Sequence, residues 1–388
     1  MSETPPFGII VHCHLRWDFV WQRPQQIVSR LAERLPVLFL EDAAPLPEGE
    51  TEPRFALTHV SNSLTVARPL LHPHTGDAEA DAEANRRNGA AWERLADTVV
   101  AHLKTTDPAW ENIVHWIYTP TAVGVRHRYN PVAVVYDCMD ELANFKNAPP
   151  RLKAQEAELM NAADVVFTGG PSMYAARKDI HSNVHLFNSG VDVAHFRRAL
   201  DDATLVPEDM AGLPTPRFLY YGVIDERMGW DNLTAVCDAH PEWSVLMVGP
   251  LTKITEEDLL RRPNLYYIGQ RTYNELPGYL KGCDVALVPF ALSDATKYLS
   301  PTKTLEYFAA RRPVVSTPIA DIVEHYSDAA RIAYTPDEFV RACEAALVAD
   351  NTERLDRGQR YAERNTWDTI VATMDEQICA VVARKGSV

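Results

Sequence analysis

The sequence lacks the cysteine pairs that mark a zinc site or a disulfide framework. Its six cysteines are scattered and no Cys-x-x-Cys pair occurs; they are Cys13, Cys138, Cys237, Cys283, Cys343 and Cys379. Isolated thiols are typical of a reducing compartment, so we expect neither disulfides nor a zinc centre.

Long apolar runs and a basic leader are missing as well. No run approaches the ~20 apolar residues that are needed to cross a bilayer. The first ten residues, MSETPPFGII, carry no basic residue ahead of their apolar stretch, unlike a secretion signal. We therefore expect a cytoplasmic protein, with the inner face of the membrane as the alternative location.

Positive charge is scarce. Lysine and arginine number 38 against 53 aspartates and glutamates, which gives a net charge of −15. This balance argues against general binding to nucleic acid or to an anionic membrane. The local cluster Arg126-His127-Arg128 leaves peripheral contact with lipid phosphates open, although such a cluster is more often a solvated loop.

What the sequence does contain is an alternation of short apolar runs and longer amphipathic segments. Its 388 residues suffice for two domains of ~100–200 residues each. Near-continuously apolar strands are expected where helices cover both faces of a parallel sheet, so the first half predicts a doubly wound α/β domain. Its predicted strands are Phe7–His12, Pro36–Leu40, Asn112–Tyr118, Val132–Tyr136, Asp164–Thr168 and Val184–Phe187, and its predicted helices are Gln22–Arg34, 77–105 and Arg151–Asn161.

A polar stretch rich in Pro, Asp and Thr, residues 200–216, interrupts this alternation and is typical of a linker. We predict a first domain at 1–203, a second at 204–365, and a final helix at 366–388 that packs back on the first. Two Rossmann-like domains of this kind would face each other across a central cleft, where α/β folds usually bind ligands. The predicted strands of the second domain are Arg217–Tyr221, Ser244–Val248, Leu265–Ile268, Val285–Pro289 and Val314–Ser316, and its predicted helices begin at Asp231, Tyr273, Lys303 and, for the helical tail, Asp337.

The strongest chemical signal is the segment Ser300-Pro301-Thr302-Lys303-Thr304-Leu305-Glu306-Tyr307. Proline fits the first turn of a helix, and free amides at that turn attract anions. Lys303 adds a full positive charge there, which a diphosphate would balance. Glu306, three residues on, can share its face and accept hydrogen bonds from a ribose diol. The plain alternative is a surface Lys–Glu pair.

With its neighbours, this segment resembles the donor site of GT-B glycosyltransferases, nearest to the retaining family four, or group 1. The resemblance covers nearly the whole chain and is stronger in the second half. It also rests on YYGVIDER (220–227), NLYYIGQ (264–270), GCDVALVP (282–289) and NSGVD (188–192).

The resemblance implies a donor site for a nucleotide-diphosphate sugar, UDP- or GDP-linked, and no bound metal or other cofactor. Glu306 would bind the ribose and Arg227 and Lys303 the diphosphate, with Gly222, Ser300 and Thr302 beside it and the backbone near Arg271 at the base. The acceptor would be a sugar, lipid-linked or small-molecule hydroxyl in polysaccharide or glycoconjugate synthesis.

Two positions depart from the family pattern. Many relatives carry a second glutamate, eight residues before the first, that helps to hold the donor sugar. This chain has Tyr298 at that position, so the identity of the donor sugar does not carry over. The arginine and lysine that usually follow the glycine loop are replaced near Val223 and Met228, and Arg227 is the candidate to supply the missing charge.

The first domain is expected to bind the acceptor. The loop after the first strand carries His14, Arg16 and Trp17, and Trp17 can either stack on a sugar or pack under the loop. Asp137 and Asp140 follow a predicted strand and are candidate catalytic residues, because neighbouring acids repel each other unless they are solvated or bonded. His14 is the next candidate.

The predicted activity is transfer of a sugar from a nucleotide sugar to an acceptor hydroxyl, with retention implied by the resemblance alone. Two alternatives remain open at this stage. The acids at 137–141 fit a GT-B-fold sugar-nucleotide epimerase, and the departures at Tyr298 and Met228 fit a catalytically degenerate partner subunit.

Overall fold

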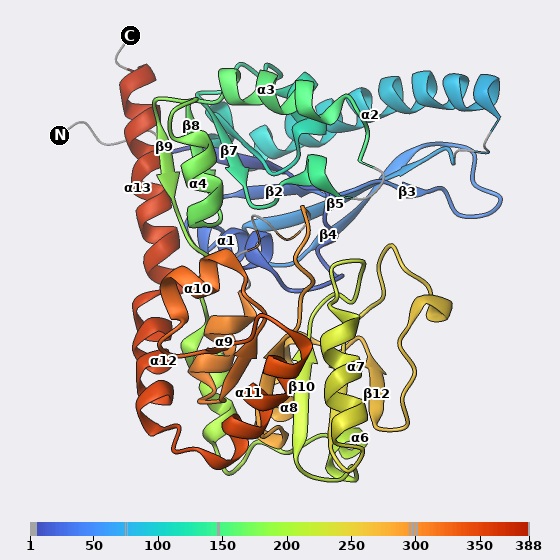
Figure 1. The fold of residues 1–388 in the computed structure, drawn as a ribbon. Coiled ribbons are helices and arrows are strands. Elements are labelled where there is room, and N and C mark those ends of the chain that lie inside the picture. The colour runs from blue at the N-terminus through green and yellow to red at the C-terminus, as the bar shows by residue number, and fades with distance from the viewer. Residues whose placement is uncertain are drawn as a thin grey trace.

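The computed structural model describes residues 6–73, 75, 77–145, 148–294, 296, 299 and 302–386. Figure 1 shows two α/β domains, one above the other, and a long C-terminal helix beside the upper domain. This arrangement confirms the predicted fold class of two facing Rossmann-like domains.

The first domain is built on one mixed sheet in the order β3-β5-β2-β1-β6-β7-β8-β9, and all neighbours on this path are parallel. A further strand, β4, pairs antiparallel with β5 at the edge. The strands are β1 (Gly8–His12), β2 (Val37–Leu40), β3 (Ala44–Pro45), β4 (Arg54–His59), β5 (Leu64–Leu71), β6 (Ile113–Ile117), β7 (Ala133–Cys138), β8 (Val165–Thr168) and β9 (Val184–Leu186).

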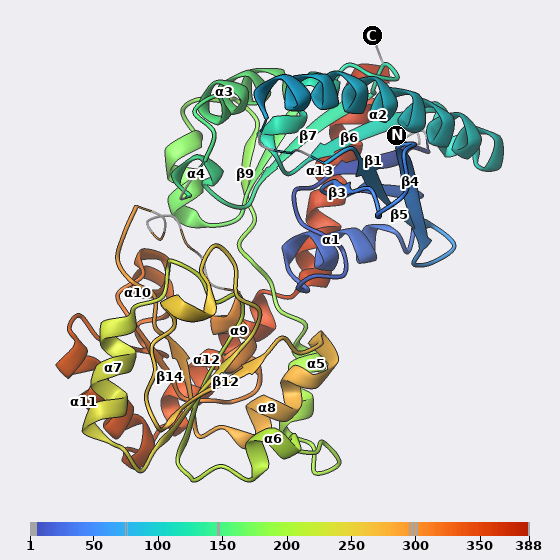
Figure 2. The same cartoon turned by 90° about the vertical axis from the view of Figure 1, so that its right-hand side faces the viewer.

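Four α-helices accompany this sheet in the described part of the first domain. The longest, α2, lies along the face of the domain that is turned away from the second domain (Figures 1 and 2). The helices are α1 (Arg23–Leu31), α2 (Ala78–Thr106), α3 (Leu152–Ala162) and α4 (Pro171–Arg177), with short 3-10 turns η1 (Pro108–Glu111), η2 (Pro120–Val125) and η3 (Leu142–Asn144).

The second domain has a fully parallel sheet in the order β12-β11-β10-β13-β14-β15. Its strands are β10 (Arg217–Tyr221), β11 (Ser244–Val248), β12 (Leu265–Gly269), β13 (Val285–Val288), β14 (Val314–Ser316) and β15 (Arg331–Ile332). The helices are α5 (Val193–Arg197), α6 (Glu208–Ala211), α7 (Trp230–Ala239), α8 (Leu276–Gly282), α9 (Lys303–Ala309), α10 (Ala320–Tyr326), α11 (Pro336–Val348) and α12 (Thr352–Arg364), with 3-10 turns η4 (Arg198–Leu200), η5 (Glu256–Asp258) and η6 (Tyr273–Glu275).

The chain passes between the domains at two adjoining places. Val191 forms a parallel bridge with Thr366, and a side chain at Gly190 would lie 2.9 Å from Ile370 and 3.0 Å from Trp367. Helix α13 (Trp367–Gly386) then packs its apolar side chains, among them Trp367, into the core of the first domain. This packing agrees with the return of the final helix that the sequence predicted.

The structure places the junction earlier than the sequence did. Val191, Phe196 and Ala199 lie in the hydrophobic core of the second domain, so the chain has left the first domain well before residue 204. The polar stretch at 200–216 is therefore part of the second domain, where Met210 is fully buried.

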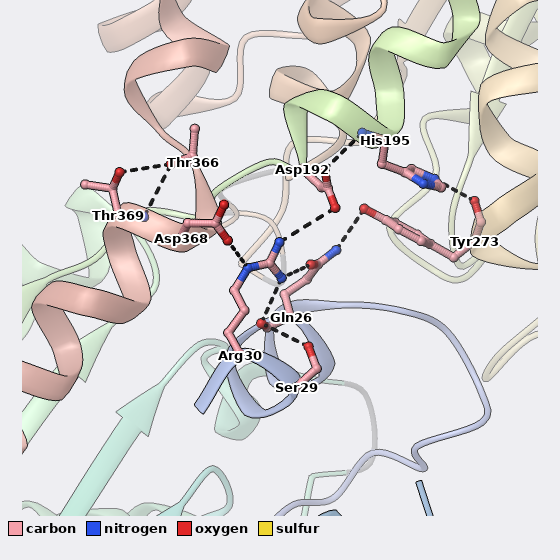
Figure 3. A network of polar contacts seen from close by, with 9 residues as sticks. All are labelled: Gln26, Ser29, Arg30, Asp192, His195, Tyr273, Thr366, Asp368 and Thr369. Atoms are coloured by element: carbon pink, nitrogen blue, oxygen red, sulfur yellow. Dashed lines mark hydrogen bonds and ion pairs between the residues drawn. The ribbon is translucent and has the colours of Figure 1, made fainter. Parts of the chain in front are cut away.

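Arg30 of helix α1 forms ion pairs next to both places where the chain passes between the domains, as Figure 3 shows. The Arg30 guanidinium lies 2.5 Å from a carboxylate oxygen of Asp368 and 3.6 Å from one of Asp192. On the same helix, the Gln26 amide donates to the Tyr273 hydroxyl at 2.9 Å. The two domains are thus joined by side chains as well as by the chain.

Two histidines form a hydrogen-bonded pair inside the first domain. His12 Nε2 and His115 Nδ1 are 3.0 Å apart, and His115 Nε2 lies 2.9 Å from the Arg128 carbonyl oxygen. Because a carbonyl only accepts, His115 donates from Nε2 and accepts from His12 at Nδ1. Burial lowers the pKa of both imidazoles, and each is neutral in this arrangement.

We expect this pair to make the fold acid-sensitive. Below the unfolded histidine pKa of about 6.5 the unfolded chain takes up protons that the folded pair does not, so stability falls as the pH falls. Between pH 7.5 and 5.5, the free energy of unfolding of His12→Gln should fall by about 1.4 kcal/mol less than that of the parent. Urea unfolding at both pH values checks this, with the exposed His102→Gln as control. An equal fall in the free energy of unfolding in all three proteins would contradict this prediction.

Candidate functional site

The loops that follow β10 and β11 meet through their backbones. Gly222 and Gly249 have φ angles of +131° and +151°, and a Cβ atom at Gly249 would lie only 1.9 Å from the Gly222 carbonyl oxygen. Glycine alone adopts these conformations without strain and permits this approach. The backbone at the carboxyl ends of both strands is consequently left bare of side chains.

Lys303 lies beside this bare backbone. A Cβ atom at Gly222 would be 3.1 Å from Lys303 Cε and 3.4 Å from its ammonium nitrogen. That ammonium lies 5.1 Å from the centre of the Phe290 ring and 5.4 Å from that of Tyr220. Burial lowers the pKa of Lys303, so a bound anion would stabilise its charged form.

Glu306 lies one turn further along α9. Its carboxylate accepts a 2.6 Å hydrogen bond from the Tyr221 hydroxyl, and burial raises its pKa. The structure thus brings Gly222, Lys303 and Glu306 together, as the sequence motif predicts. Thr302 precedes the helix and is half-buried, whereas Ser300 and Tyr298 lie outside the described residues.

Arg227 stands on the side of this group that faces the first domain. Its guanidinium donates to both oxygens of Asp225, at 2.7–3.0 Å. It also lies over the ring of Phe145, a first-domain residue, with 5.3 Å to the centroid. Arg227 is therefore held where both domains meet, with its charge balanced by Asp225.

The Arg271 side chain is engaged within the second domain. Its guanidinium donates to Asp209 at 2.6 Å and to the Tyr279 hydroxyl at 2.8 Å. The neighbouring Gln270 side chain reaches the Phe19 carbonyl of the first domain. The predicted contact of the backbone near Arg271 with the base stays a prediction.

Asp137 does not lie where we expected a substrate contact. It is fully buried at the end of β7 and forms an ion pair with Arg23, with nitrogen–oxygen distances of 3.0–3.3 Å. The Arg23 guanidinium also donates to the Phe187 carbonyl at 2.8 Å. The geometry indicates that Asp137 holds α1 against the sheet, because both of its oxygens already receive hydrogen bonds from Arg23.

Asp140 differs from Asp137, since it is only half-buried. Burial raises its pKa, and the charges of Arg227 and Lys253 from the second domain act against that shift. Of the two candidate aspartates, Asp140 is therefore the one on whose pKa the cations of the opposite domain act.

The loop after β1 contributes a histidine without a hydrogen bond at one ring nitrogen. Within the described part of the chain, His14 Nδ1 is buried and has no hydrogen-bond partner. Burial, together with the charge of Lys253, lowers the pKa of His14 to about 4. The imidazole is thus neutral at pH 7 and able to accept a proton or a hydrogen bond.

Trp17 packs under this loop. Its ring lies edge-on to Phe39 at 5.1 Å and to Trp21 at 5.6 Å between centroids, and its backbone N–H donates to Glu41 at 2.7 Å. These contacts support the packing interpretation over stacking on a sugar. Arg16 is exposed, and its contact with an acceptor stays a prediction.

Sequence reasoning missed Glu226 and Lys253. The Lys253 ammonium lies 3.5 Å from a Glu226 oxygen and 3.6 Å from the centre of the Phe145 ring. Glu226 could have been found from the sequence, because it directly precedes the candidate diphosphate ligand Arg227. No sequence signal points to Lys253, because its contact with the first domain depends on a left-handed backbone, φ +62°.

The basic cluster at 126–128 is compensated by acids. Arg126 pairs with Glu158 at 2.8 Å, and Arg128 pairs with Asp97 at 2.6 Å. Among the residues that the structure describes, no helix is both long and apolar enough to cross a bilayer. The same residues hold no group of three or more histidine, cysteine or acidic side chains arranged to bind a metal ion.

Sequence comparison assigns the second domain to a known family. The sequence model described as Glycosyl transferases group 1 matches residues 215–349. The chain is 23% identical over 269 residues to a Bacillus subtilis (strain 168) protein whose name gives it as TuaH, a glycosyltransferase of teichuronic acid biosynthesis. That match covers 61% of this chain, and the chain spans 64% of the length of this relative.

Solved structures resemble the whole chain. Sucrose-phosphate synthase from Thermosynechococcus elongatus gives a TM-score of 0.68 at 14% identity, covering 97% of this chain and 100% of the other. An E. coli structure described as trehalose-6-phosphate bound with UDP-2-fluoro glucose gives 0.67 at 13% identity, covering 96% and 99%. Residues 215–349 are thus a glycosyl transferases group 1 domain, and the chain as a whole has the GT-B fold.

Proposed function

We propose that this protein is a glycosyltransferase that moves a sugar from a nucleoside diphosphate sugar to an acceptor hydroxyl. The observation that carries the proposal is the grouping of Lys303 and Glu306 beside the bare backbone of Gly222, within the domain that matches the family. Bare backbone with a cation suits a diphosphate, and a buried carboxylate suits a ribose diol.

In this proposal the departing diphosphate is stabilised by cationic side chains rather than by a metal ion. The bond from the sugar to the diphosphate breaks, the acceptor oxygen bonds to the sugar, and the acceptor proton leaves with the diphosphate or through a protein group. Lys303 and Arg227 would bind the diphosphate oxygens more strongly as negative charge develops on them. Retention of configuration is proposed from the family resemblance.

UDP is the first nucleotide to test. One structural neighbour is described with bound UDP-2-fluoro glucose, and another is named as a UDP-forming trehalose-phosphate synthase. A GDP-sugar remains the second choice. For the acceptor, the relative named for teichuronic acid biosynthesis supports a sugar or a lipid-linked saccharide.

The test is incubation of the protein with UDP- and GDP-sugars, with and without saccharide acceptors, followed by separation of the products. We expect slow release of free sugar from one donor and a faster, acceptor-dependent transfer. Isomerised donor without transfer, or complete inertness toward every donor, would contradict the proposal.

Asp140→Asn is expected to lower turnover at least tenfold while nucleotide affinity changes little. The charges of Arg227 and Lys253 across the domain junction act on its carboxylate, which we propose orients the sugar or the acceptor hydroxyl. An interaction made mainly in the transition state lowers kcat without weakening ground-state binding. Turnover and nucleotide affinity are measured on one folded preparation. The exposed Asp179→Asn is the matched control. Full turnover in Asp140→Asn would remove this residue from the mechanism and leave His14 as the candidate.

A further inference from the structure

Glu226 carries a carboxylate without hydrogen-bond donors in the described part of the chain. Both of its oxygens are buried and have no hydrogen-bond partner, and 19% of its side chain is exposed. Among the residues that the structure describes, one cation lies close to it, the Lys253 ammonium, 3.5 Å from Oε1. A buried acceptor that lacks donors is costly unless a ligand supplies them.

Lys253 brings this carboxylate to the boundary between the domains. The residue has a positive φ of +62°, which is unfavourable for residues other than glycine. In that conformation its ammonium lies 3.6 Å from the centre of the Phe145 ring in the first domain. About a third of the side chain, 35%, remains exposed, so the ammonium keeps donors for a further partner.

The carboxylate of Glu226 and the ammonium of Lys253 therefore offer hydrogen-bond acceptors and donors side by side at the boundary between the domains. Neutral hydroxyl groups fit such a pair, because each can donate to Glu226 and accept from Lys253.

The order of charged groups along the junction indicates which hydroxyls these are. Glu306 shares helix α9 with Lys303, and the Lys303 ammonium and the Arg227 guanidinium both lie over the Phe290 ring, 5.1 and 5.9 Å from its centre. The Arg227 guanidinium and the Lys253 ammonium in turn both lie over the Phe145 ring, 5.3 and 3.6 Å from its centre. A nucleotide sugar has the same order: ribose, diphosphate, sugar. The pair Glu226–Lys253 stands at the sugar end of this order.

We propose that Glu226 and Lys253 bind the hydroxyl groups of the donor sugar, the role left open by the tyrosine at position 298. The inference rests on the proposed function, since it needs a nucleotide sugar in the site. It assigns specificity for the sugar to two residues outside helix α9, one in the loop that follows β10 and one in the loop that follows β11. The contribution of the sugar contacts to binding is measured as an affinity increment. We define this increment as the ratio of the dissociation constant of the free nucleotide to that of the nucleotide sugar.

The experiment measures that increment by calorimetry in the intact chain. UDP and GDP are titrated first, and then the glucose, galactose, N-acetylglucosamine and glucuronate conjugates of UDP or the mannose conjugate of GDP. For the best sugar, Glu226→Gln and Lys253→Met should each reduce the increment at least tenfold, with less than threefold change for the free diphosphate. The exposed Glu257→Gln should match the parent in both.

Each other result overturns the assignment. Equal losses for free and sugar-linked nucleotide would make the pair a phosphate contact. An unchanged increment in both variants, or no increment for any sugar in the parent, would remove the subsite while the nucleotide site stands. A parent that binds neither nucleotide would refute the proposed function and, with it, this inference. Melting temperatures within a few degrees of the parent show that the variants are folded.

Discussion

Asp137→Asn is expected to lower the free energy of unfolding by about 3–5 kcal/mol, because it leaves the Arg23 guanidinium buried without its anion. Both side chains are almost completely enclosed, with 4% of Arg23 and none of Asp137 exposed. The asparagine side chain has nearly the same shape, so loss of charge rather than a cavity is what the variant tests. Chemical denaturation of the parent and the variant gives the difference.

Two comparisons isolate the buried pair. Asp368→Asn removes the carboxylate of another ion pair, with Arg30, in which the acid is 81% exposed, and it should cost no more than ~1 kcal/mol. The double variant Arg23→Met with Asp137→Leu should recover much of the lost stability, because it removes both charges. An Asp137→Asn protein as stable as the parent but inactive would contradict the structural role and restore Asp137 as a catalytic candidate.

Lys303→Ala is expected to weaken binding of a nucleoside diphosphate by about 1.5–3 kcal/mol, the usual value of a hydrogen bond to a charged group. Its ammonium lies against the backbone of Gly222, where a diphosphate would approach, so a nucleoside should bind almost as well as before. Glu306→Ala is expected to cost about as much, but for the nucleoside and the diphosphate alike, since its carboxylate would hold the ribose.

The measurement is isothermal titration of parent and variants with diphosphate and with nucleoside. The exposed Lys153→Ala removes a lysine from the surface of α3 and serves as the control for charge. If Lys303→Ala and Glu306→Ala both bind the diphosphate as the parent does, the donor site lies elsewhere in the chain.

The strands of both sheets and most of the helices could be predicted, because each corresponds to an apolar pattern within a short stretch of sequence. Each predicted strand lies within two residues of an observed one at both ends. The hairpin of β4 and β5 escaped, because Arg68 and Pro69 interrupt the apolar run of β5 and proline is uncommon inside strands. The domain junction was misplaced because residues 200–216 are polar in sequence although Met210 among them is buried.

The candidate site was predictable where its residues adjoin one another in sequence. Lys303 and Glu306 share one helix, and the glycine loop is a local pattern. The partner of Asp137 is 114 positions away, and no local pattern pairs the two, so a buried ion pair could not be told from a catalytic acid. Lys253 depends on a left-handed backbone and on Phe145 of the other domain, neither of which a sequence displays.

We infer a nucleoside diphosphate site beside Gly222, Lys303 and Glu306. Thermal unfolding of the unmodified protein with UDP or GDP tests this site most directly. One of the two, at ~100 times its dissociation constant, should stabilise the fold by ~2.7 kcal/mol, while the corresponding nucleoside at the same concentration should have a clearly smaller effect. If neither diphosphate raises the unfolding temperature at millimolar concentration, the chain has no such site and the account is wrong.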